Sequence, residues 1–498
     1  MKLSKKLLAL LLALLMLLPL GAMLATAEAD AVPLIFVPGF MGTSIRENRN
    51  DPNSEKLWDP DMDAILNDVK DNLGEFLKAL VIRDWDRFGD LALDIANKYI
   101  QPVYSGDDGE VHNDSGVYFR YPDRGSISKT SRLEFSYDWR LDPMQTAAAL
   151  NDYINYVCDA AGTQQVDLHA HSFGAVITVT YLKLFGNTKV RGVFFDSPAV
   201  FGETFNGELM SGKLEVSVES MMDYMAYAFD DMEYSTLLNE VAKIARNIGL
   251  IPLLVHLGNE FIDHLQARIF KEVMVPMYAN WPSVWSMIPD EYLDDATRFI
   301  FDELCAGEDR SALREKIDAY NTQIRPYRTE TLQALNDSAH VYVLSRTGYA
   351  STPLTASHKT LSDGTIDTEN TSFGATTALY GEQLPADVLA AADPAMISPE
   401  RDIDASTCLF PEQTWFLRYA HHGDMLDAVS DFAAFLLRQP QQVTVDTFAA
   451  YPRFLIYLPA VKEIKPDPGP AKQSWLEHMK ALFAEVKLLL TAAFSKEA

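Results

Sequence analysis

A short buried strand that runs into a small-residue turn around a serine is the feature that most constrains this chain. Residues 165–169 read Gln-Val-Asp-Leu-His, and residues 170–174 read Ala-His-Ser-Phe-Gly before a β-branched run begins. A strand, a sharp turn and a helix in this order are typical of a nucleophile elbow, whose flanking positions must be small. Ala170 and Gly174 meet that requirement. The pattern predicts that Ser172 is a catalytic nucleophile if an acid and a histidine follow it in the chain.

Apolar strands that alternate with helical segments predict a mostly parallel, doubly wound α/β sheet. The predicted strands cover residues 34–37, 132–137, 166–169, 190–195 and 340–344. Between about residues 207 and 338 the strand signals fade, and methionine- and tryptophan-rich helical patterns replace them. This stretch is therefore expected to be a helical cap inserted into the core. Its methionines either contact an acyl chain or pack into a core of the cap's own.

The N-terminus has the pattern of a signal peptide, with three lysines before the apolar run 7–20 and an Ala-Thr-Ala site at 25–27. An uncleaved membrane anchor is the alternative. We expect a secreted protein, extracellular or associated with the cell envelope. The predicted order is a signal peptide (1–27), a first core part (30–206), the cap insertion (207–338), a second core part (339–462), a Pro-rich linker (463–474) and an amphipathic C-terminal helix (475–498).

The formal net charge of −28 argues against a nucleic-acid partner and against electrostatic binding to anionic lipids. Any contact with a membrane or lipid surface is therefore expected to be apolar. Three cysteines are too few for a disulfide framework. We expect no metal and no cofactor, because no clustered ligand spacing is present; the aspartates of residues 59–63 are a weak calcium candidate. The oligomeric state is left open.

An acid and a histidine follow Ser172 in the order that an α/β hydrolase uses. Asp363 lies in a polar turn after the predicted strand 340–344, where its carboxylate can orient an imidazole. On chemistry alone, either His421 or His422 could be the base. The competing acids are Asp367, Asp196, Asp402 and Asp404.

An oxyanion hole needs two backbone N–H donors that point at the developing negative charge. The residue after the nucleophile, Phe173, is expected to supply one donor. The turn 39–42, which reads Gly-Phe-Met-Gly after the first predicted strand, is expected to supply the other, because glycines let a backbone approach the substrate closely.

Together these segments resemble the lecithin:cholesterol acyltransferase family, which includes lysosomal phospholipase A2 and the phospholipid:diacylglycerol acyltransferases. The most specific match is residues 137–143, Tyr-Asp-Trp-Arg-Leu-Asp-Pro. The other matching segments are residues 33–45, 56–58, 170–174, 281–289, 362–366 and 422–425.

The resemblance implies an α/β-hydrolase fold and the triad Ser172, Asp363 and His422, and it selects His422 over His421. It also implies that Phe40 and Phe173 supply the oxyanion donors. We expect Met41, Trp58 and Trp285 to contact the substrate. Two departures are that Ser362 replaces a glycine before the acid and that no cysteine pair frames Trp58 as in a lid disulfide.

These observations predict a serine acyl hydrolase or O-acyltransferase that acts on lipid acyl esters, either phospholipid or glycerolipid. The acyl acceptor is water or an alcohol, and the sequence leaves that choice open. A general carboxylesterase or lipase with non-phospholipid substrates is the first alternative. A non-catalytic binding protein on a hydrolase scaffold is the second.

Overall fold

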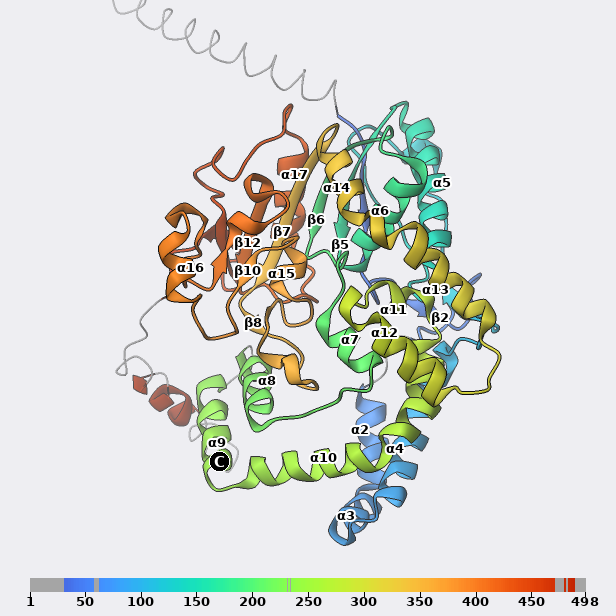
Figure 1. The fold of residues 1–498 in the computed structure, drawn as a ribbon, viewed down its shortest axis with the longest axis vertical. Coiled ribbons are helices and arrows are strands. Elements are labelled where there is room, and N and C mark those ends of the chain that lie inside the picture. Colours follow the sequence, from blue (N-terminus) through green and yellow to red (C-terminus); the bar gives the residue numbers. More distant parts are fainter. Residues whose placement is uncertain are drawn as a thin grey trace, which may run out of the picture.

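A central eight-stranded sheet organises the molecule (Figure 1). The computed structural model describes residues 31–57, 62–230, 232, 234–470, 479, 480 and 482–488. The strand order is β14-β13-β12-β7-β6-β5-β1-β4, and every neighbouring pair is parallel except β13 and β14. The strands are β1 (Leu34–Val37), β4 (Arg132–Glu134), β5 (Val166–His171), β6 (Val190–Asp196), β7 (His340–Thr347), β12 (Thr414–Arg418), β13 (Phe454–Leu458) and β14 (Glu463–Pro466).

The central strands β5, β6, β7 and β12 are buried on both faces, whereas the edge strands β4 and β14 are largely exposed. On β7, Val341 and Val343 belong to one hydrophobic core, while Tyr342 and Leu344 belong to the other. The first core lies under α5 (Pro143–Ala161) and α6 (Phe173–Phe185), and the second lies under α17 (Asp427–Leu437). The predicted doubly wound, mostly parallel α/β sheet is therefore confirmed.

Local sequence signals set the ends of the helix before the elbow strand. The side chain of Asp142 accepts a hydrogen bond from Met144 N at the start of α5, where Pro143 occupies the first turn. Gly162, with φ of 65°, ends the helix in a left-handed conformation that glycine adopts without strain. The chain then enters β5, whose six residues are all buried.

A largely helical insertion connects β6 to β7. Three of its helices, α8, α9 and α10, form an arm beyond the carboxyl edge of the sheet, and α10 contacts α4 (Figure 1). The insertion comprises α7 (Thr204–Met210), α8 (Val218–Asp230), α9 (Ser235–Asn247), α10 (Leu250–Ile269), a π-helix (Phe270–Ala279), α11 (Pro282–Ser286), α12 (Leu293–Thr297), a second π-helix (Arg298–Leu304), α13 (Ser311–Gln323) and α14 (Arg328–Asn336).

The arm has a small hydrophobic core of its own. Met221, Met222 and Met225 of α8 pack against buried residues that include Val216 and Ile251. At the other end of the insertion, α14 packs on α6 and β7, so this last helix is a crossover helix of the sheet. The cap proper therefore ends before the expected boundary at residue 338.

The remaining elements surround the carboxyl edge of the sheet and its flank. They are α2 (Met62–Asp71), α3 (Leu73–Ile82), α4 (Trp85–Ile100), α15 (Thr368–Thr371), α16 (Ala386–Ala391) and the strand pairs β2 (Ile45–Arg46) with β3 (Gly116–Val117), β8 (Tyr349–Ala350) with β9 (Leu361–Ser362) and β10 (Thr376–Thr377) with β11 (Ile403–Asp404).

The structure corrects the predicted linker at residues 463–474. Its first four residues form the edge strand β14, which pairs antiparallel with β13. Ile464 is buried between exposed Glu463 and Lys465, so the alternation of a strand is present. Pro466 is tolerated because an edge strand pairs on one side only. The predicted signal peptide lies outside the described residues, and the predicted C-terminal helix is described only at 479, 480 and 482–488.

No single helix in the described ranges combines the length and the hydropathy of a membrane span. Only α9 taken together with Leu250–Ala279 passes that test, as a pair bent by 73°.

Candidate active site

Three side chains meet at the carboxyl edge of the sheet, where ligands bind in open α/β folds. The hydroxyl of Ser172 donates to His422 Nε2 at 2.9 Å, and His422 Nδ1 donates to Asp363 Oδ2 at 2.6 Å. Ser172 follows β5, Asp363 follows β9, and His422 lies between β12 and α17. The structure thus brings the predicted triad residues into one hydrogen-bonded chain.

The turn at Ser172 has the strained backbone of a nucleophile elbow, with φ of 54° and ψ of −123°. Two glycines make the turn possible. A Cβ at Gly174 would lie 2.1 Å from the carbonyl oxygen of Val37, so only glycine lets α6 start this close to β1. A Cβ at Gly39 would lie 2.7 Å from the Cβ of Ser172. The predicted oxyanion turn therefore lies directly against the nucleophile.

The structure distinguishes the candidate acids and bases that chemistry alone left open. The buried carboxylate of Asp363 also accepts backbone N–H groups of Thr365 and Ile366, at 3.0 and 2.8 Å, which orients it toward His422. Asp367 instead accepts from Thr204 N at 2.9 Å. The competing acids Asp196, Asp402 and Asp404 have other partners: Arg346, Arg418 and Ser406 N.

The neighbouring His421 has a separate environment. Its ring stacks on Tyr227 of α8, with 4.5 Å between the ring centroids. Burial lowers the pKa of His421, so its imidazole is neutral at neutral pH. The choice of His422 over His421 agrees with the hydrogen bond between His422 and Ser172.

The Tyr-Asp-Trp-Arg segment holds the oxyanion turn in place. The hydroxyl of Tyr137 donates to the carbonyl of Pro38 at 2.6 Å, and the indole N–H of Trp139 donates to the carbonyl of Thr43 at 2.9 Å. Arg140 is fully buried, and its guanidinium group makes two hydrogen bonds to Asp138 in the same loop, at 2.9 and 2.7 Å. The bonds of Tyr137 and Trp139 attach the first loop of the sheet to the loop after β4.

The aromatic ring of Phe40 packs against the rings of Trp139 and Phe173, with centroid distances of 4.8 and 6.1 Å. Phe173 opens α6 directly after the nucleophile. The two predicted oxyanion donors therefore belong to segments in contact with each other. Their donor role stays a prediction.

Opposing effects set the pKa values of His422 and Asp363. Burial favours the neutral form of His422, but the charge and hydrogen bond of Asp363 outweigh it and raise its pKa above the ordinary 6.5. Burial favours the neutral form of Asp363, but the charge and hydrogen bond of His422 and two backbone donors hold its pKa below the ordinary value. This arrangement stabilises the imidazolium that forms when His422 accepts a proton.

A buried ion pair joins the nucleophile elbow to the base loop. Arg346, at the end of β7, donates from Nε and Nη2 to Asp196 at 2.8 and 2.7 Å. Its third nitrogen, Nη1, donates to the carbonyls of His421 and Asp424 at 2.9 and 2.8 Å. The backbone of Asp196 accepts the N–H of Ser172 at 3.0 Å. The ion pair of Arg346 and Asp196 therefore contacts both the elbow that carries Ser172 and the loop that carries His422.

Asp196 also faces the two histidines of β5. The Oδ2 atom of Asp196 lies within hydrogen-bond distance of His169 Nε2, at 3.4 Å. The same atom lies 3.2 Å from His171 Nδ1, but the two are not aligned for a hydrogen bond. Burial lowers the pKa of His171 to about 4, so this ring is neutral where it packs on His422. Arg346 was not predicted from the sequence, although an arginine that directly follows the apolar run 341–344 was a usable signal.

We expect Arg346→Lys to lower kcat by about 10- to 100-fold. A lysine cannot hydrogen-bond to Asp196 and to the two loop carbonyls at the same time, so His422 would lose its alignment with Ser172. KM should change little. The matched control is Arg418→Lys, another buried arginine, which binds both oxygens of Asp402. Steady-state kinetics and thermal unfolding of both variants check this. Equal kcat losses in the two variants would contradict a specific role for Arg346.

Glu203 is a buried carboxyl group, 7% exposed, and no sequence pattern indicated it. It precedes α7, and its charge raises the pKa of His422, so the two groups lie within electrostatic reach. Burial raises the pKa of Glu203 from 4.5 to about 7. The neutral form therefore stabilises the fold at acid pH. This contribution is complete below pH 4.5 and is lost as the pH rises through about 7.

Glu203→Gln keeps the neutral form at every pH. The variant should therefore unfold about 2 to 4 °C higher than the wild type at pH 8.5 and at the same temperature at pH 4.5. The acid limb of kcat/KM should also move to lower pH, because His422 loses the charge that raises its pKa. Thermal melts and a pH–rate profile measure the two effects. An unchanged melt at pH 8.5 would show that burial does not raise the pKa of Glu203.

The three predicted substrate-contact residues have different outcomes. Met41 is 39% exposed in the oxyanion turn, with φ of 61°, so it is available to a substrate. Trp58 lies outside the described residues. The prediction that Trp285 contacts the substrate is corrected. Trp285 is 1% exposed, its indole N–H donates to the carbonyl of Ala279, and its ring stacks on Phe301. It belongs to the packed core of the insertion because all its surfaces have protein partners.

Within the part of the chain that the structure describes, no group of three or more His, Cys, Asp or Glu side chains is arranged to hold a metal ion. The weak calcium candidate at residues 59–63 lies largely outside that part. The three cysteines are buried and unpaired with one another.

The sheet, the elbow and the Ser–His–Asp chain together define an α/β-hydrolase-like fold. No protein-family model matches this chain, and no curated protein matches it. The solved structures that resemble this chain include the following two, and both resemblances are weak. The Tle4–Tli4 complex has 14% identity and a TM-score of 0.26 over 65% of this chain and 75% of that one. The esterase RhEst1 from Rhodococcus sp. ECU1013 has 11% identity and a TM-score of 0.22 over 81% of this chain and 88% of that one.

Proposed function

We propose that this protein is an exported serine acyl hydrolase or O-acyltransferase that acts on lipid acyl esters through an acyl-enzyme. The observation that carries the proposal is the hydrogen-bonded chain from Ser172 through His422 to Asp363, on an elbow with a strained nucleophile. Such a chain activates a hydroxyl that is otherwise a weak nucleophile. Export rests on the signal-peptide pattern of residues 1–27.

The reaction follows from the geometry of the three groups. Ser172 Oγ attacks the ester carbonyl while His422 Nε2 takes its proton, and the negative charge develops on the carbonyl oxygen beside the turn 39–42. His422 then protonates the leaving alcohol, and an acyl-enzyme forms. Water or a second alcohol attacks this intermediate with His422 again as the base. Asp363 keeps the Nδ1 proton of His422 in place throughout.

Exposed apolar side chains support a lipid substrate. Val81 and Ile82 of α3 are 79% and 63% exposed, and Ile248 and Leu254 beside the corner between α9 and α10 are 73% and 55% exposed. Figure 1 shows α3 and this corner at the same end of the molecule, beyond the carboxyl edge of the sheet. Contact with a lipid surface at this end would be apolar, as the net charge requires. The resemblance to the lecithin:cholesterol acyltransferase family supports the same substrate class.

Vesicles of phosphatidylcholine with a labelled acyl chain test the proposal. We expect labelled fatty acid, or a labelled ester when a long-chain alcohol is added, and the ratio of the two products separates hydrolysis from transfer. A short soluble ester is assayed in parallel. Cleavage of the soluble ester without any release from vesicles would replace the lipid proposal with a general carboxylesterase. Inactivity on both, with no fluorophosphonate labelling of Ser172, would favour a non-catalytic binding protein.

A further inference from the structure

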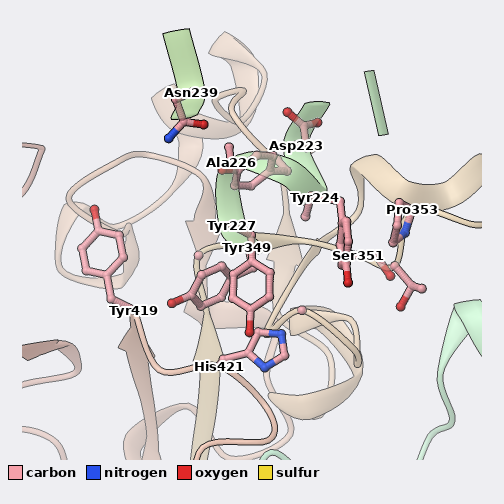
Figure 2. A pocket seen from close by; sticks show the side chains of 15 residues that line it. Asp223, Tyr224, Ala226, Tyr227, Asn239, Tyr349, Ser351, Pro353, Tyr419 and His421 are labelled. Atoms are coloured by element: carbon pink, nitrogen blue, oxygen red, sulfur yellow. The ribbon is translucent and has the colours of Figure 1, made fainter. Parts of the chain in front are cut away.

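A cavity of about 500 Å³ lies next to the loops that carry Asp363 and His422. Figure 2 shows the side chains that line it. It opens between α8 of the insertion and the loops that follow β7 and β12. Neither Ser172 nor a residue of the oxyanion turn lines it, so it is separate from the site of bond cleavage. Its wall includes Gly364 and His421, the chain neighbours of Asp363 and His422. We call it the aromatic cavity.

Tyrosine rings form much of the wall of the aromatic cavity. Tyr227 stacks on His421 with an interplanar angle of 18°. Tyr349 stands across both rings, at 80° to Tyr227 and 74° to His421, with centroids 5.5 Å away in each case. The result is a corner of nearly perpendicular aromatic surfaces. The other tyrosines in the lining are Tyr224, Tyr380 and Tyr419.

The lining of the aromatic cavity carries one acidic side chain. Among the described residues that line it, Asp223 is the one carboxylate and none is a lysine or an arginine. Lys359 and Arg246, outside the lining, lie within electrostatic reach of Asp223. His421 adds no positive charge at neutral pH because burial lowers its pKa. The face of each tyrosine ring is a site of negative potential. An anion such as a phosphate would find no charged partner in this lining.

We propose that the aromatic cavity binds an organic ammonium group. Perpendicular aromatic walls and one carboxylate form the arrangement that recognises alkylated ammonium groups through cation–π attraction. The ammonium group can belong to the headgroup of the acyl lipid, in which case its role rests on the function proposed above, or to a free amine in solution. The binding itself does not depend on catalysis.

Titration calorimetry with the wild-type protein tests the site. The probes are choline and its neutral isostere 3,3-dimethyl-1-butanol, which differ in charge and match in shape. We expect choline to bind at least about tenfold more tightly than the isostere. Tyr227→Leu and Asp223→Asn should each weaken choline binding. Equal binding of the two probes, or no binding of choline by the folded wild type, would overturn the proposal.

Tyr121→Leu is the matched control, because Tyr121 and Tyr227 are both 39% exposed and Tyr121 does not line the cavity. It should bind choline as the wild type does. Thermal unfolding of each variant shows whether the fold survives. Asp223→Asn keeps the side-chain shape, so it tests the charge even if Tyr227→Leu disturbs α8. Loss of choline binding in Tyr121→Leu alone would overturn the assignment to this cavity.

The two sources of the ammonium group are separated by activity on vesicles of phosphatidylcholine and phosphatidylglycerol. If the headgroup occupies the cavity, Tyr227→Leu should lower the ratio of kcat/KM on phosphatidylcholine to kcat/KM on phosphatidylglycerol by about tenfold. If a free amine occupies it, the ratio should stay constant while choline binding is lost. Vesicle inactivity of the wild type, with choline binding intact, would reject the proposed lipid function and leave the ammonium site standing.

Discussion

Replacement of Ser172 by alanine is expected to lower acyl release by at least about 10⁴-fold, because the variant lacks the oxygen that forms the acyl-enzyme. In the structure this oxygen lies 2.9 Å from His422 Nε2 and is 3.1 Å from the position that a Cβ would take at Gly39. Labelled-vesicle hydrolysis measures the loss. A fluorophosphonate probe should label the wild type and fail to label the variant.

The control for this variant is Ser372→Ala. Ser372 is fully buried and uses its hydroxyl in local hydrogen bonds at the end of α15, to Glu369 and Ala375. We expect a modest loss of stability and full probe labelling. Ser172→Ala should melt close to the wild-type temperature, since within the described part of the chain the hydroxyl of Ser172 hydrogen-bonds only to His422. Residual activity above about a tenth of the wild-type value would place the nucleophile elsewhere.

Asp363→Asn is expected to lower kcat by about 10⁴-fold while the fold persists. The carboxylate holds the Nδ1 proton of His422 at 2.6 Å, so Nε2 is free to accept the proton of Ser172. An amide can present its own N–H to Nδ1 and so favour the opposite tautomer. The charge of Asp363 also raises the pKa of His422, so the acid limb of the residual activity should move to lower pH. A pH–rate profile measures both effects.

Asp367→Asn is the matched comparison, four residues along the same turn. Burial raises the pKa of Asp367 to about 6, and its carboxylate accepts the N–H of Thr204 rather than a histidine. An amide oxygen can accept that bond, so we expect kcat within about tenfold of the wild type. If Asp367→Asn were as inactive as Asp363→Asn, the acid of the triad would be assigned wrongly.

Much of the fold follows from local patterns in the sequence. The five predicted strands are all present, as β1, β4, β5, β6 and β7, although β4 ends at Glu134 and not at residue 137. The prediction of a linker at 463–474 failed because the prolines and charged residues of this segment are typical of a loop. One buried residue, Ile464, is nevertheless enough to attach an edge strand. Trp285 was expected to contact the substrate, because tryptophan suits a substrate site as well as a hydrophobic core. Burial on every side made it a core residue, which no spacing in the sequence shows.

The sequence by itself determined the elbow around Ser172 and five of the eight strands of the sheet, because both depend on residues that are neighbours in the chain. It did not predict β12 and β13. Only the tertiary structure decided which acid and which histidine meet. The bond between His422 and Asp363 joins residues 59 positions apart, and the bond between His422 and Ser172 spans 250. The tertiary structure alone also revealed Arg346 and the aromatic cavity. Their partners come from separate loops, and only the packing of the sheet and insertion brings those loops together.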